Sequence, residues 1–382
     1  METAFWVALA LIGHGYVGYP LWMAAAAAFW PRAVLGDDAH TPDVDVLLIV
    51  HDAEAEVGRK IENLLALDYP PARLRVNVVC DGCGDATESV ARQYSGARVR
   101  VFAHAARRGK SACIGSALPH LDAEIVLFTD VRQRIDPGAA RALAAAFADP
   151  RIGAASGELV LEPANGYGQG INDYWRYETV IRRLESASGS LVGVSGALYA
   201  ARRSAIATVP EGIILDDMWV PLTVAAAGYR VVVIPQAMAY DRAPHDPAIE
   251  ERRKRRTLAG NYQLLHRWPA LALPGAHPLA LRLWGHKWLR LLAPWLLALV
   301  LGLNALLAVG SVPYKVLFVL QLACYALAAL GRLVPMTLGV LPIRLASTFL
   351  SLNLSAAFAL VNYVAKRNLH LWSAARAGGD VP

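Results

Sequence analysis

The chain has few cysteines, and its single Cys-x-x-Cys motif has no second pair to accompany it. Four cysteines occur in 382 residues, and their scattered positions exclude a disulfide framework. Cys80 and Cys83 have the spacing of a redox or zinc half-site. Because no other pair completes such a site, Cys83 is expected to occupy a tight turn instead.

Charged residues are absent from four apolar segments, at residues 4–30, 291–310, 316–331 and 345–364. A helix that crosses a bilayer needs about 20 apolar residues, so three of the segments are long enough and 316–331 is short. No Lys or Arg precedes the first segment, which argues against a signal peptide. With 55% hydrophobic residues, the chain is expected to be an integral membrane protein in contact with membrane lipids.

Charge around the first apolar segment predicts its orientation. Arg32 follows the segment closely, so the positive-inside rule places the N-terminus outside and residues 32–275 in the cytoplasm. The expected location is a bacterial inner or cell membrane. Three further spans would leave the basic residues after 365 outside, so residues 333–343 are a candidate re-entrant piece and the side of the C-terminus stays open.

The net charge of +6 is concentrated in one basic run, Arg252–Arg256. No nucleic-acid-binding motif accompanies this run, so nucleic acid is not an expected partner. A basic stretch just before apolar segments is typical of contact with acidic lipid headgroups or with a phosphorylated ligand.

The middle of the chain alternates between strand and helix patterns. Strands are predicted at residues 44–50, 74–80, 98–104 and 124–129, and helices at 54–67, 85–94, 110–118 and 137–148. This alternation predicts an α/β fold with a largely parallel sheet and crossover helices.

Acidic residues stand where two of the predicted strands end. Asp81 follows one strand and Asp130 follows another, and ligands of such sheets bind at the carboxyl ends of the strands. Further on, Asp216 and Asp217 form a carboxylate pair that can supply a base. On an extended segment the two side chains would point to opposite sides, so one would face a substrate and the other would cap the following helix. Asp85 is expected to be a helix cap.

Several short motifs follow one another in a fixed order. They are Asp52-Ala-Glu54, Asp81-Gly-Cys-Gly-Asp85-Ala-Thr87, Arg108-Gly-Lys110, Asp130-Val-Arg132, Gly193-Val-Ser-Gly196, Leu215-Asp-Asp217 and Gly228-Tyr-Arg230. Their order and spacing resemble membrane-bound family 2 glycosyltransferases, which have a GT-A catalytic domain between transmembrane segments. The resemblance covers nearly the whole chain. It implies a transmembrane helix at 4–30, a GT-A domain at 41–275, an interfacial segment at 276–290 and about three transmembrane helices at 291–365.

The resemblance also implies a reaction and its residues. The expected activity is the inverting transfer of a hexose from a nucleotide-sugar donor to a saccharide or lipid-linked acceptor at the cytoplasmic membrane face, as in polysaccharide biosynthesis. Asp217 is the implied base, with Asp216 beside it. The implied donor-binding residues are Glu54, Asp81, Lys110, Asp130 and Arg256. Asp130 is also the implied ligand of a divalent cation, Mg²⁺ or Mn²⁺, which would hold the leaving diphosphate.

Three positions depart from the family pattern. Arg132 replaces the second Asp of Asp-x-Asp, so a cation at Asp130 would rely on substrate phosphates and water for its other ligands. The opening Asn-Glu-Glu reads Asp52-Ala-Glu54. Arg253-Lys-Arg-Arg256-Thr257 stands in place of the Gln-x-x-Arg-Trp of processive synthases. If that segment covers the site, Arg256 clamps the diphosphate; a helix facing lipid headgroups is the competing interpretation.

Other functions stay open at this point. A processive polysaccharide synthase is disfavoured by the missing Gln-x-x-Arg-Trp. A polyprenyl-phosphate sugar transferase typically lacks an N-terminal span, which this chain has. An inactive membrane scaffold subunit is suggested by the changed motif residues, but the presence of Asp81, Asp130 and Asp217 opposes it. The large polar middle disfavours a transporter.

Overall fold

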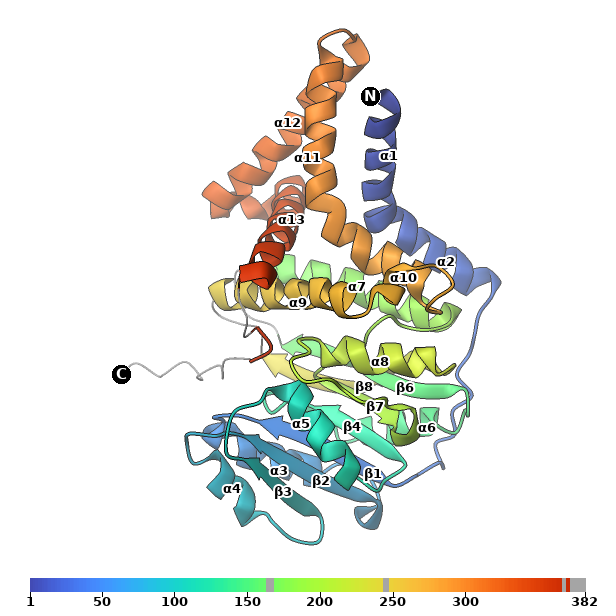
Figure 1. Cartoon of the computed structure of the whole chain (residues 1–382), viewed down its shortest axis with the longest axis vertical. Helices are drawn as coiled ribbons and strands as arrows, with labels where there is room; N and C mark the ends of the chain where they lie inside the picture. The colour runs from blue at the N-terminus through green and yellow to red at the C-terminus, as the bar shows by residue number, and fades with distance from the viewer. Residues whose placement is uncertain (163–167, 243–246, 366–368, 372–382) are drawn as a thin grey trace. The chain divides into compact units, whose positions relative to one another are not determined.

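The computed structural model describes residues 1–162, 168–242, 247–365 and 369–371 (Figure 1). The chain divides into two units. The helical unit comprises residues 1–26, 164–181 and 244–367, and the sheet unit comprises residues 27–163, 182–243 and 368–382. Helix α7 (Gly168–Ser188) contributes to both.

The described part of the sheet unit contains one eight-stranded sheet in the order β3-β2-β1-β4-β7-β6-β8-β5. The strands are β1 (Val44–Val50), β2 (Leu74–Asp81), β3 (Val99–His104), β4 (Ile125–Thr129), β5 (Arg134–Ile135), β6 (Ile152–Glu162), β7 (Leu198–Arg202) and β8 (Arg230–Arg242). Strands β3, β2, β1 and β4 pair in parallel, as predicted. The second half of the sheet is mixed, because β7 lies antiparallel between β4 and β6 and β5 lies antiparallel to β8.

The strand β1 forms the centre of the parallel half. All seven of its residues are buried, which explains why it reads as a continuous apolar run rather than an alternating one. Val50 of β1 pairs with Cys80 of β2, and Leu48 pairs with Thr129 of β4. This register brings three residues to one edge of the sheet: His51, which follows β1, Asp81, which ends β2, and Asp130, which follows β4.

Helices connect the strands of the sheet unit. They are α3 (Glu54–Leu65), α4 (Thr87–Gln93), α5 (Lys110–Ala117), α6 (Ala139–Ala146) and α8 (Asp216–Ala226), with short 3₁₀ turns at Pro71–Arg73, Leu118–His120 and Arg203–Ala205. The first four confirm the predicted helices to within two residues at each end. In α3 the apolar residues Val57, Ile61 and Leu64 are fully buried against the sheet, as helical spacing requires.

The helical unit carries the apolar segments. Its elements are α1 (Glu2–Gly13), a π-helical turn (His14–Gly18), α2 (Tyr19–Phe29), α9 (Pro247–Arg267), a 3₁₀ turn (Pro269–Ala272), α10 (Ala280–Leu283), a second π-helical turn (Trp284–Trp288), α11 (Leu289–Ala308), α12 (Val312–Leu333), a 3₁₀ turn (Pro335–Gly339) and α13 (Leu341–Ala365). Helix α1 runs beside α11 (Figure 1).

Among the described residues, four helices are long and apolar enough to cross a membrane: Glu2–Phe29, Ala280–Ala308, Val312–Leu333 and Leu341–Ala365. The third contains the charge-free stretch 316–331, which looked too short for a span in the sequence. Its helix of 22 residues gains length by including Lys315 and Arg332 near its ends, where long basic side chains can reach the membrane surface.

A buried ion-pair cluster joins α7 to the start of α11 within the helical unit. Glu178 of α7 accepts hydrogen bonds from Arg290 and from His286, the latter at 2.9 Å. Arg290 also donates to the hydroxyl of Tyr177 at 3.1 Å. Burial would raise the pKa of Glu178, but the charge of Arg290 and the neighbouring His286 outweigh burial and hold that pKa well below its usual range.

We expect Glu178→Ala to lower the free energy of unfolding by about 3–5 kcal/mol, because it leaves a buried guanidinium without its carboxylate. Thermal unfolding in neutral detergent measures the effect. Glu251→Ala is the matched control, since Glu251 pairs with Arg255 in a partly exposed i,i+4 arrangement that contributes about 0.3–0.5 kcal/mol. Equal losses in the two variants would contradict the role of the cluster.

Candidate active site

The loop before α5 is organised by Asp81. This side chain is fully buried, and its two carboxylate oxygens accept hydrogen bonds from the backbone N–H groups of Arg108 at 2.7 Å and Gly109 at 2.9 Å. Gly109 has a φ of +90°, which glycine adopts without strain. Asp81 therefore holds the turn that places Lys110 at the first position of α5.

Lys110 connects two of the predicted site carboxylates. Its Nζ lies 2.8 Å from Oδ1 of Asp130 and 3.2 Å from Oδ2 of Asp216. Burial would lower the pKa of Lys110, but the carboxylates of Asp130 and Asp216 outweigh burial and raise it. Lys110 is therefore charged at neutral pH, and it fixes a positive group between residues that follow β4 and begin α8.

The pair Asp216 and Asp217 lies in the first turn of α8, and the expectation of an extended segment was wrong. Consecutive residues of a helix are separated by roughly 100° rather than pointing to opposite sides. Carboxylates are favoured in a first turn by the helix dipole, which explains why the helix begins before Trp219. Asp216 is buried, whereas Asp217 is only half-buried.

A proline in α8 leaves one helix carbonyl without its usual partner, and that carbonyl bonds to the loop 193–196 instead. Pro221 has no N–H, so it cannot donate to the carbonyl of Asp217 four residues earlier. That carbonyl instead accepts a hydrogen bond from the N–H of Val194 at 2.9 Å. A side chain at Gly196 would come within 3.4 Å of Oδ2 of Asp217. The loop 193–196 thus packs directly against Asp217.

The aromatic ring of Tyr199 in β7 lies near the site carboxylates. This residue was not identified from the sequence as part of the site. Its ring is fully buried and stacks on Phe128 of β4, with the centroids 4.4 Å apart and the planes at 6°. Burial and the neighbouring carboxylates of Asp216, Asp217 and Asp130 raise the pKa of Tyr199 well above its usual range. The only signal in the sequence was its place in the motif that follows Gly196.

Arg132, which replaces the second Asp of Asp-x-Asp, forms an ion pair with a carboxylate of β8. It lies 3.0 Å from Oδ2 of Asp241 in β8, and Gln133 donates to the same oxygen at 2.7 Å. Asp241 was missed by the sequence analysis, although it also lies near the end of a strand. The buried side chain of Lys60 donates a hydrogen bond to the hydroxyl of Thr129 at 2.9 Å. Burial lowers the pKa of Lys60 to about 7.

Glu54, a predicted donor-binding residue, contacts the turn that leads into α4. Glu54 accepts a hydrogen bond from the N–H of Ala86 at 3.0 Å. Asp85 accepts from the N–H of Thr87 at 3.0 Å, so it holds the turn into α4. Arg256 lies on α9 of the helical unit. The structure therefore brings together Lys110, Asp130 and Asp216, with Asp81 ordering the adjacent loop.

A family model described as "Glycosyltransferase like family 2" matches residues 42–260. The chain belongs to this family. The match confirms the resemblance that the motifs indicated.

Individual family 2 relatives are distant. The chain is 22% identical over 235 residues to "Probable glycosyltransferase YdaM" of Bacillus subtilis, a match that covers 58% of this chain and 55% of the relative. It is 28% identical over 155 residues to "Beta-monoglucosyldiacylglycerol synthase" of Synechocystis, covering 39% of this chain and 32% of that protein. The matches thus span about half and about a third of these relatives.

A solved structure resembles the chain along most of its length. The mannosyltransferase PcManGT from Pyrobaculum calidifontis, solved with GDP-Man and Mn²⁺, superposes with a TM-score of 0.70 and 24% identity. The match covers 94% of this chain and 99% of that one. This likeness confirms the predicted α/β GT-A fold.

Proposed function

We propose that the chain transfers a sugar, with inversion, from a nucleotide-diphosphate donor to an acceptor hydroxyl. The observation that carries this proposal is the Lys110 ammonium, which lies between Asp130 and Asp216 at the carboxyl edge of a family 2 sheet. Such a transfer needs positive charge for the departing diphosphate and a carboxylate for the acceptor proton. The PcManGT structure contains a nucleotide sugar, which supports the same donor class here.

The residues around Asp130 fit a divalent cation, Mg²⁺ or Mn²⁺. The Asp130 side chain is 43% exposed, so it has room for a ligand besides Lys110. Hard cations bind oxygens and often take several of them from phosphates and water, which suits a site where Arg132 replaces the second carboxylate. Bound at Asp130, the cation would supply further positive charge for the diphosphate. PcManGT was solved with Mn²⁺.

The two carboxylates of α8 are suited to different tasks. Asp216 is buried and paired with Lys110 at 3.2 Å, so it positions the ammonium that faces the donor phosphates. Asp217 is half-buried and is held through its backbone by Val194. Its carboxylate is therefore the better candidate to accept the proton of the acceptor hydroxyl as that oxygen attacks the sugar.

The acceptor is proposed to be saccharide or lipid-linked and to react at the cytoplasmic membrane face. The four apolar helices bring the chain to a bilayer by length and composition, and one relative is named as a synthase of a glucosyl diacylglycerol. Arg32 after the first apolar helix favours a cytoplasmic sheet unit. A topology reporter fused after residue 40 should be active on the cytoplasmic side, and activity on the outer side alone would reject this orientation.

A thermal-stabilisation screen tests the donor proposal. Nucleotide sugars and the matching free sugars are added to the full chain in neutral detergent, with Mn²⁺, with Mg²⁺ or with a chelator. We expect at least one nucleotide sugar to raise the unfolding temperature in a cation-dependent way, because a ligand that binds the folded state stabilises it. If no nucleotide sugar stabilises the chain more than its free sugar does, the donor class is wrong.

A further inference from the structure

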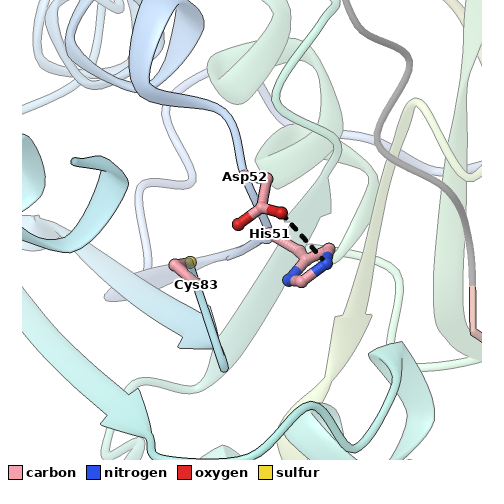
Figure 2. Close-up of side chains that lie close together, drawn as sticks. All are labelled: His51, Asp52 and Cys83. Atoms are coloured by element: carbon pink, nitrogen blue, oxygen red, sulfur yellow. Dashed lines mark ion pairs between the residues drawn. The ribbon is translucent and has the colours of Figure 1, made fainter. Parts of the chain in front are cut away.

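A second group of ligand-type side chains lies where β1 and β2 end. His51 and Asp52 follow β1, and Cys83 lies two residues after β2 (Figure 2). One nitrogen, one oxygen and one sulfur from these residues all lie within 4.8 Å of one another. The parallel pairing of Val50 with Cys80 explains the meeting, since it sets the two strand ends side by side.

The imidazole of His51 is oriented by Asp81, and its Nε2 points toward Asp52 (Figure 2). Its Nδ1 lies 2.8 Å from the backbone carbonyl oxygen of Asp81. A carbonyl oxygen only accepts hydrogen bonds, so Nδ1 donates, and in the neutral imidazole Nε2 carries the lone pair. Histidines that bind metals are commonly oriented in this way, by donating their other N–H to a carbonyl or carboxylate.

The carboxylate of Asp52 is held in the same manner. Its Oδ1 accepts a hydrogen bond from the N–H of Gly84 at 2.8 Å, while its Oδ2 lies 3.6 Å from Nε2 of His51. In a tetrahedral zinc site, bond lengths of about 2.0–2.3 Å place neighbouring ligand atoms roughly 3.3–3.8 Å apart. The His51–Asp52 spacing matches this value. Asp52 also has a φ of +46°, a conformation that is uncommon for residues other than glycine.

Cys83 completes the group as its sulfur ligand. It is half-buried, at a position that ligands from solvent can reach. Its Sγ–H donates to the backbone carbonyl of Val50 at 3.7 Å. A thiolate is the form that binds metals, so binding requires loss of this proton.

We propose that one imidazole nitrogen of His51, one carboxylate oxygen of Asp52 and Sγ of Cys83 bind a divalent cation of the zinc class, at a site separate from the oxygen ligands of Asp130. Nitrogen, sulfur and oxygen donors together suit Zn²⁺, whereas Mg²⁺ and Mn²⁺ favour oxygens alone. Binding replaces the Cys83 thiol proton, which passes to solvent, with a sulfur–metal bond. Three protein ligands leave one tetrahedral position for water or another small ligand.

The site is connected to the Lys110 group through Asp81. The backbone carbonyl of Asp81 orients His51, and its carboxylate holds the N–H of Gly109 beside Lys110. A cation bound at His51 would therefore be connected, through Asp81, to the loop that precedes Lys110. The binding proposal itself rests on the three ligand atoms and does not depend on the proposed function.

Cobalt is the probe for this site, because a bond between Co²⁺ and a thiolate gives an absorption band in the near ultraviolet. The full chain in neutral detergent, reduced and freed of metal by a chelator, is titrated with Co²⁺ and then with Zn²⁺. We expect the band to saturate at one equivalent, to disappear when Zn²⁺ is added, and to persist in excess Mg²⁺. Absence of the band, or its displacement by Mg²⁺, would overturn the proposal.

Variants assign the band to the three residues. Cys83→Ser is expected to abolish it, and His51→Gln to weaken Co²⁺ binding at least about tenfold, since losing even a residue that only orients a ligand costs 10–100-fold. Cys324→Ser, which changes an exposed cysteine in α12, should leave the band unchanged. Cys80→Ser tests the Cys-x-x-Cys alternative: a band lost in Cys80→Ser but kept in His51→Gln would overturn the assignment. If Cys83→Ser does not fold, His51→Gln decides.

Discussion

Asp217→Asn is expected to lower the rate of sugar transfer by roughly 10²–10⁴-fold, the usual cost of losing a general base. The change keeps the size of the side chain and removes its basicity, so the acceptor hydroxyl loses its proton acceptor. Donor binding is expected to remain, because Lys110 contacts Asp130 and Asp216 and neither pair is altered. Transfer rates at saturating donor, together with donor affinity from calorimetry, measure the two effects separately.

Asp216→Asn is the matched comparison for this prediction. It removes the charge that lies 3.2 Å from the Lys110 ammonium, so it should alter donor affinity through Lys110 more than the transfer rate at saturation. A larger loss of saturated rate in Asp216→Asn than in Asp217→Asn would reverse the two roles. Sugar transfer at the wild-type rate in Asp217→Asn would show that Asp217 is not the general base.

Asp130→Ala is expected to abolish cation-dependent binding of a nucleoside diphosphate. The change removes the half-exposed carboxylate proposed to hold the cation and leaves Lys110 paired with Asp216. Titration of nucleoside diphosphate in the presence of Mn²⁺ or a chelator measures the loss. Asp85→Ser is the control, because Asp85 holds the turn before α4 and its loss should cost about 1 kcal/mol of stability. Cation-dependent binding that survives in Asp130→Ala but not in Asp85→Ser would overturn the assignment.

Arg256→Ala separates the two interpretations of the basic run in the same titration. If Arg256 clamps the donor, affinity for a nucleoside diphosphate falls in neutral detergent and affinity for the nucleoside does not. If the run faces lipid headgroups, binding in detergent is unchanged and only association with anionic vesicles weakens. Unchanged diphosphate affinity therefore rejects the clamp.

Local patterns were sufficient to predict the first half of the sheet unit. Strand β1 is buried along its whole length, so its apolar run is visible without knowledge of its partners, and α3 shows the spacing of a half-buried helix. The pairing of β7 between β4 and β6 was not predictable in this way. It joins Phe128 to Tyr199 across the sheet, and no local pattern records such distant partners.

The sequence was sufficient to identify several residues of the site. It was not sufficient to predict which of them would contact one another. Position after a strand was enough to single out Asp81 and Asp130. The sequence did not show that Asp81 would hold the backbone of Arg108 and Gly109, or that Lys110 would reach two carboxylates. An extended segment was also considered at Asp216 from the sequence, and the structure has a helix there that contains Pro221. The carbonyl that this proline leaves free instead bonds to Val194, a contact made only in the folded chain.

Release of nucleoside diphosphate from a nucleotide sugar tests the central claim most directly. The full chain in detergent is mixed with each stabilising nucleotide sugar and a lipid or saccharide acceptor, with Mn²⁺ or Mg²⁺ and with a chelator, and the free nucleoside diphosphate is measured over time. We predict repeated turnovers that depend on the cation and are lost in Asp217→Asn. Release that never exceeds the protein-free control with any nucleotide sugar, or equal release by wild type and Asp217→Asn, would contradict the proposed function.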